Sequence, residues 1–600
     1  MKEMNSNNKR FKLVDLFAGA GGLSKGFEQT GCFETIGAVE INQAAIETYV
    51  YNHGGNRDII IRPDESDTSD ISKIDFRKWK KSKNIDPNLL TIIGGPPCQG
   101  FSNANRQKNY LISGNNQLVI EFFRAIDEIR PAAFLMENVP SMNSDKHKFF
   151  ITKHLDNSRF AYSSLEHLTC LFNTSKEKLI ENKFLMDDKI ILMESVEISL
   201  SHIWRKIIDG STPPKPIIGD HNYLSRLKSI SKKIIKTEGN PSLSLKEKKD
   251  IIRIIELINQ QLKTFQADGD HLSTKDIVSR GKAALQLLLE DFEEFDKCAK
   301  KDITNFMSLN LILLRIKELN DEKIRYELYI DDTHKDNIKI IAKVWSYNIV
   351  KYLEMAFHQI GYNTDFGVLT ATDFGVPQIR RRFIILGVRN DLFENSPKLP
   401  DALVHSTPFT VRDAIQDLAD ITPLTDMEKA KPLDYIESDA QASPMLRYFR
   451  KDADKGLIDN HINTESRQLS KTRFEAILQL KGKNFHSLND ELKTTYSDVS
   501  RTQNTIYLRL DYGSPSPTVV NVRKSMWSHP EKARAISIRE AARLQSFPDN
   551  FKFRGTKDQQ YQQVGNAVPP LLGRAAAEAL LNAMGVEPTI SLKNELLDLE

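Results

Sequence analysis

The segment Asp15-Leu-Phe-Ala-Gly-Ala-Gly-Gly22 decides the fold class of this 600-residue chain. The apolar stretch Phe11–Phe17 predicts a strand, and an amphipathic pattern that runs on to about Thr30 predicts a helix. Glycines between a strand and a helix let the backbone approach a ligand, and the start of the helix offers free N–H groups. An acid, Glu40, closes the next predicted strand, where it can accept hydrogen bonds from ribose hydroxyls. The pattern is typical of a nucleotide- or nucleoside-binding α/β fold.

Further apolar runs extend this predicted sheet. Leu89–Ile93 and Ala132–Glu137 are predicted to be buried strands, and each ends in a polar motif. After a long interruption, Val344–Tyr362 predicts a helix, and Thr364–Thr370 and Phe383–Val388 predict two more strands. Strands that alternate with helical patterns indicate an α/β core with a mostly parallel sheet.

Changes of composition divide the chain into segments. Residues from about 150 are rich in Lys, Ile, Leu and Glu at helical spacing, and Ser244 with Glu247 forms a predicted capping box at the start of one helix. Another helix is predicted at Leu285–Phe295, and the region from about 390 is rich in loops. The predicted segments are a first part of the core at 1–149, a helical insertion at 150–342, a second part of the core at 343–392, a smaller loop-rich domain at 393–535 and a C-terminal segment that returns to the core at 536–600.

Composition limits the classes of protein. The chain is 40% hydrophobic and 27% charged with a formal net charge of +3, which is normal for a globular protein and compatible with a basic nucleic-acid face. Its four cysteines lie far apart without disulfide or metal-ligand spacing, so we expect reduced thiols and no metal. No apolar run approaches the roughly 20 residues that span a bilayer. We therefore expect a cytoplasmic protein.

Three polar motifs follow predicted strands. Gly94-Gly-Pro-Pro-Cys98-Gln-Gly-Phe-Ser102 places a cysteine after two rigid prolines, at the carboxyl end of a strand, where open α/β sheets bind ligands. Glu137-Asn138-Val139 ends the next strand candidate. Further on, Gln378, Arg380 and Arg382 occupy alternating positions in the segment that leads into another predicted strand. Alternating positions of an extended segment lie on one face. A nucleophilic thiol and a carboxylate are thereby predicted side by side in a parallel sheet, and the arginines lead into another predicted strand.

The order of these motifs identifies a resemblance. DLFAGAGG, GGPPCQGFS, ENV, QIRRR, REAARLQSFPD (Arg539–Asp549) and QVGNAVPP (Gln563–Pro570) are similar to the conserved blocks of the cytosine-C5 DNA methyltransferases of bacterial restriction–modification systems. The resemblance spans residues 13 to 570, apart from the insertion, which compact relatives lack. It implies a Rossmann-like, S-adenosylmethionine-dependent methyltransferase core with a helical insertion and a target-recognition domain at 393–535.

The resemblance also implies roles for the motif residues. Cys98 would attack C6 of a flipped-out cytosine, Glu137 would hold the base, and Arg380 and Arg382 would contact the base and support the carboxylate and the active-site loop. The loop from Gln99 to about Gln117 would close over the base. Residues expected to support the base or this loop are Gln99, Ser102, Asn138 and Gln378.

S-adenosylmethionine is the cofactor that the resemblance implies. Glu40 would bind its ribose, and Asp70 resembles the acid that binds adenine. The complete set of expected cofactor-binding residues is Phe17, Gly19, Ala20, Gly21, Gly22, Glu40, Asp70, Ile71, Pro97, Asn566 and Ala567.

The expected macromolecular partner is double-stranded DNA, read by the 393–535 segment. Basic residues there that are candidates for contacts with phosphates or guanine edges are Arg447, Arg450, Arg501, Arg509, Arg523 and Lys524. A cognate restriction endonuclease and a protein partner of the 150–342 insertion are further expectations, in the setting of the bacterial cytosol or nucleoid.

Three alternatives differ in substrate or class. A tRNA cytosine-C5 methyltransferase shares the chemistry, but RNA-directed relatives are compact where this chain has 393–535. A catalytically silent cofactor- or DNA-binding regulator would not need Cys98, Glu137, Arg380 and Arg382. Adenine-N6 or cytosine-N4 methyltransferases use an Asp/Asn-Pro-Pro-aromatic motif without a nucleophilic cysteine.

Overall fold

The computed structural model describes most of the chain and divides it into two compact units. The first unit comprises Met1–Cys98, Leu118–Ser144 and Leu353–Glu600, and the second contains Asp145–Tyr352. The described residues are 10–64, 66–97, 117–144, 148–155, 159–197, 201–209, 215–236, 242–264, 272–289, 297–332, 337–403, 407–436, 443–495, 499 and 502–596.

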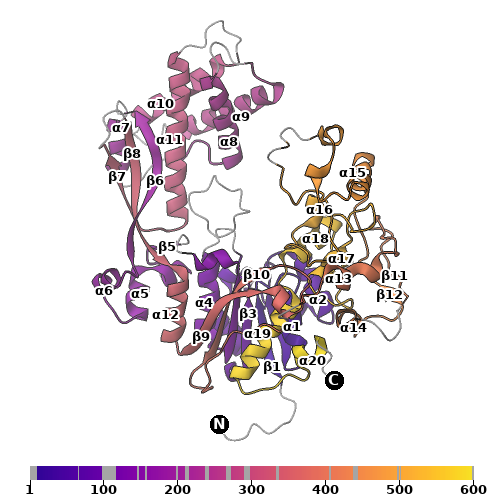
Figure 1. Ribbon diagram of the computed structural model, residues 1–600. Coiled ribbons are helices and arrows are strands. Elements are labelled where there is room, and N and C mark those ends of the chain that lie inside the picture. The colour runs from indigo at the N-terminus through magenta and orange to yellow at the C-terminus, as the bar shows by residue number, and fades with distance from the viewer. Residues whose placement is uncertain are drawn as a thin grey trace. The chain divides into compact units, whose positions relative to one another are not determined.

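A six-stranded sheet forms the centre of the first unit, in the order β2-β1-β3-β4-β10-β9 (Figure 1). Neighbours among β2, β1, β3 and β4 are parallel, whereas β10 runs antiparallel to both β4 and β9. The strands are β1 (Phe11–Leu16), β2 (Phe33–Val39), β3 (Leu90–Gly94), β4 (Ala133–Asn138), β9 (Tyr362–Thr370) and β10 (Arg381–Arg389). The prediction of an α/β core with a mostly parallel sheet is therefore confirmed.

The middle strands are apolar along their length because helices shield both faces of a sheet of this class. Every residue of β3 and β4 is buried, including Glu137 and Asn138 at the polar carboxyl end of β4. The helices of this unit are α1 (Gly22–Glu28), α2 (Gln43–Asn52), α3 (Phe76–Ser82), α4 (Gln117–Ile129), α12 (Ile349–Gln359), α13 (Val411–Ile415), α14 (Pro444–Arg450), α15 (Gln468–Gln479), α16 (Val522–Ser525), α17 (Ile538–Leu544), α18 (Lys557–Asn566), α19 (Pro570–Ala583) and α20 (Leu592–Leu596). Two short strands, β11 (Leu433–Asp434) and β12 (Leu457–Ile458), pair within the loop-rich region.

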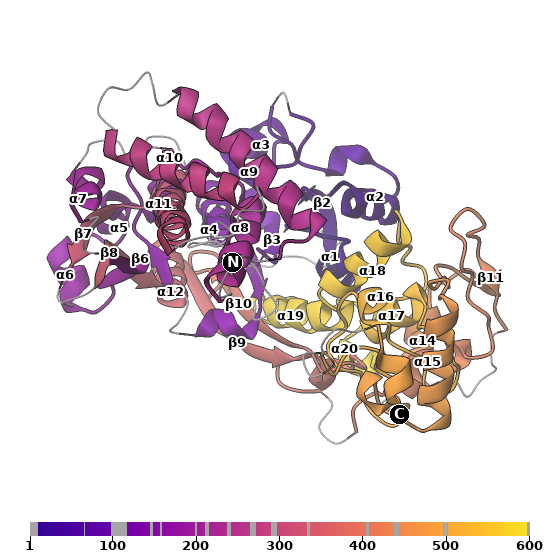
Figure 2. The same ribbon diagram turned by 90° about the horizontal axis from the view of Figure 1, so that it is seen from above.

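The two ends of the first unit lie side by side, as the indigo α1 and the yellow α19 show in Figures 1 and 2. A Cβ atom on Gly26 of α1 would lie 2.3 Å from the carbonyl oxygen of Pro570, which begins α19. Only a glycine permits so close an approach of two helices. Helix α19 of the C-terminal segment thus packs against α1 of the N-terminal part of the core.

The second unit combines helices with an antiparallel sheet. Its four strands are ordered β5-β8-β6, with β7 also paired to β8. They are β5 (Lys148–Phe150), β6 (Met186–Glu197), β7 (Tyr326–Asp331) and β8 (Asn337–Asn348). The helices are α5 (Leu165–Leu171), α6 (Lys176–Glu181), α7 (Ser201–Asp209), α8 (His221–Lys236), α9 (Leu245–Thr264), α10 (Leu272–Leu287) and α11 (Lys297–Asp321). A hydrophobic core of its own, centred on residues such as Trp204, Phe306 and Leu309, holds them together.

The purely helical prediction for 150–342 is incomplete, and one helix was predicted where a strand runs. β8 continues to Asn348, so the helix predicted from Val344 begins only at Ile349. Ile338, Ile340, Ala342 and Val344 all lie in the core, and this spacing of two residues is that of a strand. The predicted helix at Leu285–Phe295 ends early, because α10 stops at Leu287 and 290–296 lie outside the described residues.

The predicted capping box is confirmed. The Ser244 backbone N–H donates to Glu247 Oε2 at 2.7 Å, and the Glu247 N–H donates to Ser244 Oγ at 3.3 Å. Among the described residues, no helix is both long and apolar enough to cross a bilayer.

Candidate active site

Glu137 and Arg382 form an ion pair at one edge of the sheet. Glu137 is near the carboxyl end of β4, and Arg382 is near the start of the antiparallel neighbour β10. Arg382 Nε lies 2.6 Å from Glu137 Oε1, and the two side chains are only 14% and 11% exposed. A carboxylate and a guanidinium so poorly hydrated interact more strongly than a surface pair.

The turn that follows β3 contacts the residues at the same edge of the sheet. The Asn138 side-chain amide donates to the Pro96 carbonyl oxygen at 3.1 Å, which joins the residue after Glu137 to the turn that follows β3. A Cβ atom on Gly95 would lie 2.8 Å from Glu137 Oε2, so Gly95 makes room for the carboxylate. The turn that leads into Cys98 therefore lies against Glu137. Cys98 itself, Gln99, Ser102 and the predicted loop up to residue 116 lie outside the described residues, whereas Gln117, the last residue of that predicted loop, begins α4.

Arg380 has a different environment from Arg382. Its Nη1 donates to the carbonyl oxygens of Val519 at 3.2 Å and Gly565 at 3.3 Å, and the residue is 2% exposed. These bonds attach the start of β10 to the loop before α16 and to α18. A direct contact of Arg380 with the base stays a prediction.

Gln378 is the centre of a buried hydrogen-bond network. Its Nε2 donates to Gln545 Oε1 at 2.9 Å, and its Oε1 accepts from the Val519 N–H at 2.7 Å. Gln545 in turn donates to the Val564 carbonyl at 2.8 Å. Three motifs far apart in the chain thereby meet. Sequence reasoning did not single out Gln545 within the motif Arg539–Asp549, because its complete burial becomes visible only in the structure.

The glycine turn after β1 has the backbone geometry of a ligand-binding turn. Phe17, Gly19 and Gly21 have φ angles of +59°, +56° and +97°. The Gly19 N–H donates to Glu40 Oε2 at 2.8 Å, and the Asn42 N–H donates to Glu40 Oε1 at 2.7 Å. Glu40 therefore braces the turn, and burial raises the pKa of its carboxyl despite these two hydrogen bonds.

Asp70 lies near Glu40. The Glu40 N–H donates to Ser69 Oγ at 3.2 Å, and the adjacent Asp70 caps a short 3-10 helix by accepting from the Ser72 N–H at 3.1 Å. Ile71 is 4% exposed, and its carbonyl oxygen accepts from Arg124. Asp70 and Ile71 are thus brought beside the acid that follows β2.

The C-terminal segment completes this neighbourhood. A Cβ atom on Gly22 would lie 2.3 Å from the Val568 carbonyl oxygen and 3.4 Å from the Ala567 Cβ, so this segment packs on the glycine turn. Ala20 and Ala567 are buried, whereas Asn566 is exposed and accepts a hydrogen bond from Gln562 at 2.8 Å. Pro97 is half-buried.

These residues fit S-adenosylmethionine. A Cβ atom on Gly19 would meet no atom within 4 Å, so there is space above the turn. Glu40 offers carboxylate oxygens to ribose hydroxyls, and the turn offers backbone donors. Sequence reasoning missed Ile41, which is 65% exposed directly after Glu40 and offers an apolar surface to an adenine ring. Its signal was an apolar residue in a polar turn.

Comparison with known proteins identifies the family. Residues 11–164 and 336–582 match the family described as C-5 cytosine-specific DNA methylase, which is more than half of the 600 residues. The chain belongs to this C-5 cytosine DNA methylase family.

Individual relatives match with different coverage. The Type II methyltransferase M.XorII of Xanthomonas oryzae pv. oryzae is 31% identical over 267 residues, which cover 42% of this chain and 59% of that protein. M.AgeI of Thalassovita gelatinovora is 23% identical over 642 positions, which cover 95% of this chain and 99% of that protein. A crystal structure of an E. coli chain described as a prophage-encoded DNA modification methyltransferase has a TM-score of 0.48 at 19% identity, with 96% of this chain and 99% of that chain covered. The chain spans between 55% and 59% of the length of the first three curated relatives.

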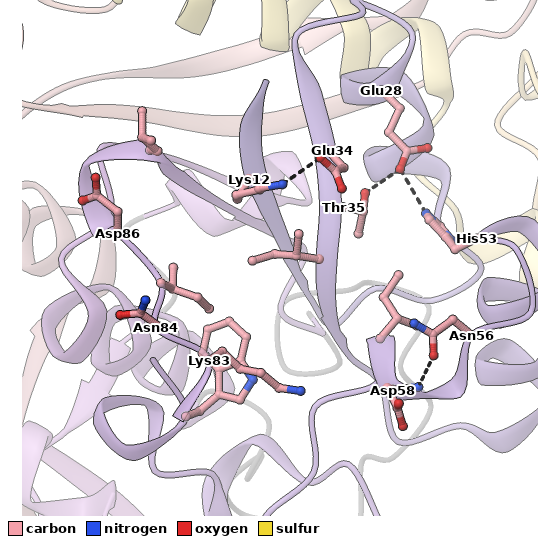
Figure 3. Close-up of a pocket in the computed structure, with 15 residues that line it drawn as sticks. Lys12, Glu28, Glu34, Thr35, His53, Asn56, Asp58, Lys83, Asn84 and Asp86 are labelled. Carbon is pink, nitrogen blue, oxygen red and sulfur yellow. Dashed lines mark hydrogen bonds and ion pairs between the residues drawn. The ribbon is translucent and has the colours of Figure 1, made fainter. Parts of the chain in front are cut away.

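The first unit also contains a large cavity (Figure 3). It has a volume of about 780 Å³ and is lined by Lys12 and Glu34, near the amino ends of β1 and β2, together with His53 and Trp79. Glu28 lies between Thr35 and His53 there, as Figure 3 shows. Because ligands of open α/β sheets bind at the carboxyl ends of the strands, this cavity is not the expected cofactor site.

Several residues predicted to contact DNA also bind other parts of the first unit. Arg450 Nη1 lies 3.3 Å from Asp549 Oδ2, and Arg509 donates to the carbonyl oxygens of Gly482 and Pro530. Arg523 pairs with Asp558 at 3.0 Å. Arg447 and Lys524 are exposed, and Arg501 lies outside the described residues.

Asp15, in the motif that contains the glycine turn, is a buried acid, and its burial predicts that stability depends on pH. Burial raises the pKa of its carboxyl to about 7, although Ser24 and His53 oppose this and Glu40 and Glu28 add to it. Its Oδ2 has no hydrogen-bond partner among the described residues. Between the unfolded pKa of about 3.9 and the folded pKa, the folded state keeps a proton that the unfolded state releases, so the free energy of unfolding falls as pH rises.

Asp15→Asn should abolish this fall of the unfolding free energy with rising pH, because the asparagine amide does not ionise. Relative to wild type, the variant should gain about 3 kcal/mol of unfolding free energy between pH 5 and pH 8. Urea unfolding at the two pH values measures this. Equal stability differences at both would contradict a buried acid that titrates near neutrality, and Asp58→Asn, at an exposed acid of the same unit, is the control.

Proposed function

We propose that this chain is a DNA (cytosine-5-)-methyltransferase. It transfers a methyl group from S-adenosylmethionine to C5 of a cytosine flipped out of a specific duplex DNA sequence, as the modification enzyme of a restriction–modification system. The observation that carries the proposal is the Glu137–Arg382 pair, which lies against the Gly95–Pro97 turn that delivers Cys98. Family membership and the Type II methyltransferase relatives support it.

The chemistry explains why a thiol and a carboxylate are needed together. C5 of cytosine is too electron-poor to attack a methyl donor directly. When the Cys98 thiolate forms a bond to C6, electron density moves to C5 and N3, and C5 becomes nucleophilic. After C5 has gained the methyl group, a base removes the C5 proton, the C6–sulfur bond breaks and the thiolate is regenerated.

Glu137 would hold the target base during these steps. Arg382 fixes Oε1 of the carboxylate, and the absence of a side chain at Gly95 leaves room beside Oε2. The carboxyl group would contact N3 and the exocyclic amine, and it would hold the proton at N3 as charge develops there. Asn138 keeps the turn before Cys98 at a fixed distance from this carboxylate.

S-adenosylmethionine supplies an electrophilic methyl group when bound. Glu40 would accept from its ribose hydroxyls, Ile41 would pack on its adenine, and the turn from Phe17 to Gly22 would line the methionine part. Asp70, Ile71, Pro97, Asn566 and Ala567 would complete the pocket.

Duplex DNA would be the substrate, read by the segment 393–535. The cytosine must leave the helix, because its C6 atom cannot be reached inside the base stack, and flipping costs a few kcal/mol. A cognate endonuclease would cleave the same sequence where it is unmethylated.

Trapping on 5-fluorocytosine tests the proposal. Fluorine at C5 cannot leave as a proton does, so the covalent adduct should persist on duplex DNA with S-adenosylmethionine. We expect a denaturation-resistant complex with wild type, none with Cys98→Ala and an undiminished yield with Cys170→Ala, since Cys170 is an exposed cysteine of α5.

RNA of the same sequence is the comparison substrate. Adduct formation on the RNA alone would replace the DNA proposal with a tRNA-type activity. An adduct that survives Cys98→Ala would refute the assignment of the nucleophile. Sequencing the trapped duplexes would give the recognised site.

A further inference from the structure

Helices α8 and α9 of the second unit each bury one apolar face. The residues that enter the core of this unit from α8 are Leu224, Leu227, Ile230 and Ile234, and those from α9 are Ile251, Ile254, Ile255 and Ile258. Spacings of three and four residues keep each set on a single face. Figures 1 and 2 show these helices with α10 and α11. The opposite faces of α8 and α9 are therefore left for solvent or a partner.

Positive charge is concentrated on these two helices. Together they carry ten lysine and arginine residues against three acidic residues, in a chain whose formal net charge is only +3. The three acids are neutralised locally: Asp250 pairs with Arg226 at 2.6 Å, Glu247 with Lys233 at 3.0 Å and Glu256 with Arg253 at 2.7 Å. The first two pairs cross from one helix to the other and hold the helices in register.

Seven lysines of the two helices lie outside these pairs, and four of them are exposed on the helix surfaces. Lys228 and Lys232 are one turn apart on the exposed side of α8, and Lys246 and Lys249 are likewise exposed on α9. None of these four forms an ion pair with a carboxylate in the part of the chain that the structure describes. Lys246 is also in the first turn of α9, where the helix dipole disfavours a cation.

We propose that this lysine face of α8 and α9, formed by Lys228, Lys232, Lys246 and Lys249, binds the phosphate backbone of duplex DNA without reading its sequence. The proposal rests on the proposed function, because it takes the same DNA as its ligand. It gives the insertion a role that the methyl-transfer site does not provide, namely an additional electrostatic contact that increases affinity and association rate.

The composition of the face favours phosphates over a protein partner. Protein interfaces are depleted in lysine and enriched in aromatic residues at their centres. Here the exposed residues among the lysines include Ser225 and Ser229, whose hydroxyl groups also donate to phosphates. The exposed apolar residues on α9, Leu245 and Ile252, are single side chains of the kind found on any surface.

The dependence of DNA binding on salt measures such contacts. We expect the full-length chain to bind a random-sequence duplex with an affinity that falls steeply with salt, and each lost phosphate contact should reduce the slope of log K against log [salt] by about 0.9. Lys228→Gln with Lys232→Gln, and Lys246→Gln with Lys249→Gln, should each reduce the slope by about 1–2. The four-residue combination should weaken binding at least about tenfold near 0.15 M salt.

Lys178→Gln with Lys183→Gln is the matched control. It removes the same charge from exposed positions in or just after α6 of the same unit, and it should leave the slope within error of wild type. Glutamine preserves helix propensity, so the variants should fold. Methyl transfer at saturating DNA should remain within about twofold of wild type, because no residue of the methyl-transfer site is changed.

Two results would overturn the proposal: a four-lysine variant with the wild-type slope and affinity, or a control pair that lowers the slope as much as either test pair. Failure of the proposed function looks different. In that case wild type would methylate no duplex DNA, whatever its salt dependence.

Discussion

Replacing Glu137 with glutamine should lower kcat for methyl transfer by about 10²–10⁴-fold, the usual range for loss of a positioned acid–base group. The change preserves the size of the side chain but removes the carboxylate that Arg382 holds at 2.6 Å. The amide cannot exchange a proton with N3 as charge develops on the ring. Single-turnover transfer of labelled methyl groups to duplex DNA measures the effect.

The control for this variant is Glu47→Gln, because Glu47 also pairs with an arginine, Arg57, at 2.7 Å but on an exposed surface. It should retain wild-type activity. Binding of S-adenosylmethionine to Glu137→Gln should be unchanged, since Glu40 and the glycine turn are intact. A Glu137→Gln enzyme within tenfold of wild type would show that this carboxylate is structural.

Asp549→Asn should destabilise the first unit by about 3–5 kcal/mol, because it removes the charged carboxylate that Arg543, Arg450 and Arg539 share in the buried interior. Asp549 Oδ2 lies 2.7 Å from Arg543 and 3.3 Å from Arg450, and Arg539 is 3.7 Å from its Oδ1. Burial acts to raise the pKa of Asp549, but Arg543 and Arg539 outweigh it and hold that pKa below its usual value. Urea unfolding at pH 7 measures the loss.

An exposed pair of the same type provides the control. Asp454 lies 3.0 Å from Lys552 but is 63% exposed, so Asp454→Asn should cost less than about 1 kcal/mol. If Asp549→Asn cost no more than this, the buried cluster would not contribute to stability in the way its geometry implies.

This buried cluster gives the motif Arg539–Asp549 a structural explanation. Arg543 bonds to Asp549 within the motif and also lies 2.7 Å from Asp417, in the loop-rich region. Arg450 joins the same carboxylate from α14. The motif therefore anchors the segment 393–535 to the α17 region. The resemblance located the motif in the chain, but it did not reveal this network.

Local sequence patterns predicted the core well. Continuous apolar runs placed β1, β3 and β4 to within one residue at each end, and the glycine turn after β1 was recognised from its spacing. Such features depend on neighbours in the chain: strand burial on two faces requires an apolar run, and a left-handed backbone favours glycine. Order of motifs then predicted that the C-terminal segment returns to the first strand.

Local sequence patterns did not predict strands whose hydrogen-bonded partner strands are distant in the sequence. The Ile- and Lys-rich strands of the second unit resemble helices in composition. Strand β6 pairs with β8, and helices α7–α11 lie between these two strands in the sequence. Antiparallel pairing over such a separation leaves little trace in the local pattern, because the hydrogen bonds are made between backbones.

The sequence by itself determined the family, the mostly parallel sheet, and the presence of Cys98, Glu137, Arg380 and Arg382 near the ends of strands. Only the tertiary structure decided which of the two arginines pairs with Glu137 and which secures the chain to Val519 and Gly565. Both stand in the same motif on the same face of the chain. The two arginines differ in the contacts that they make with strands and loops more than 100 residues away in the sequence, and spacing along one segment cannot encode such contacts.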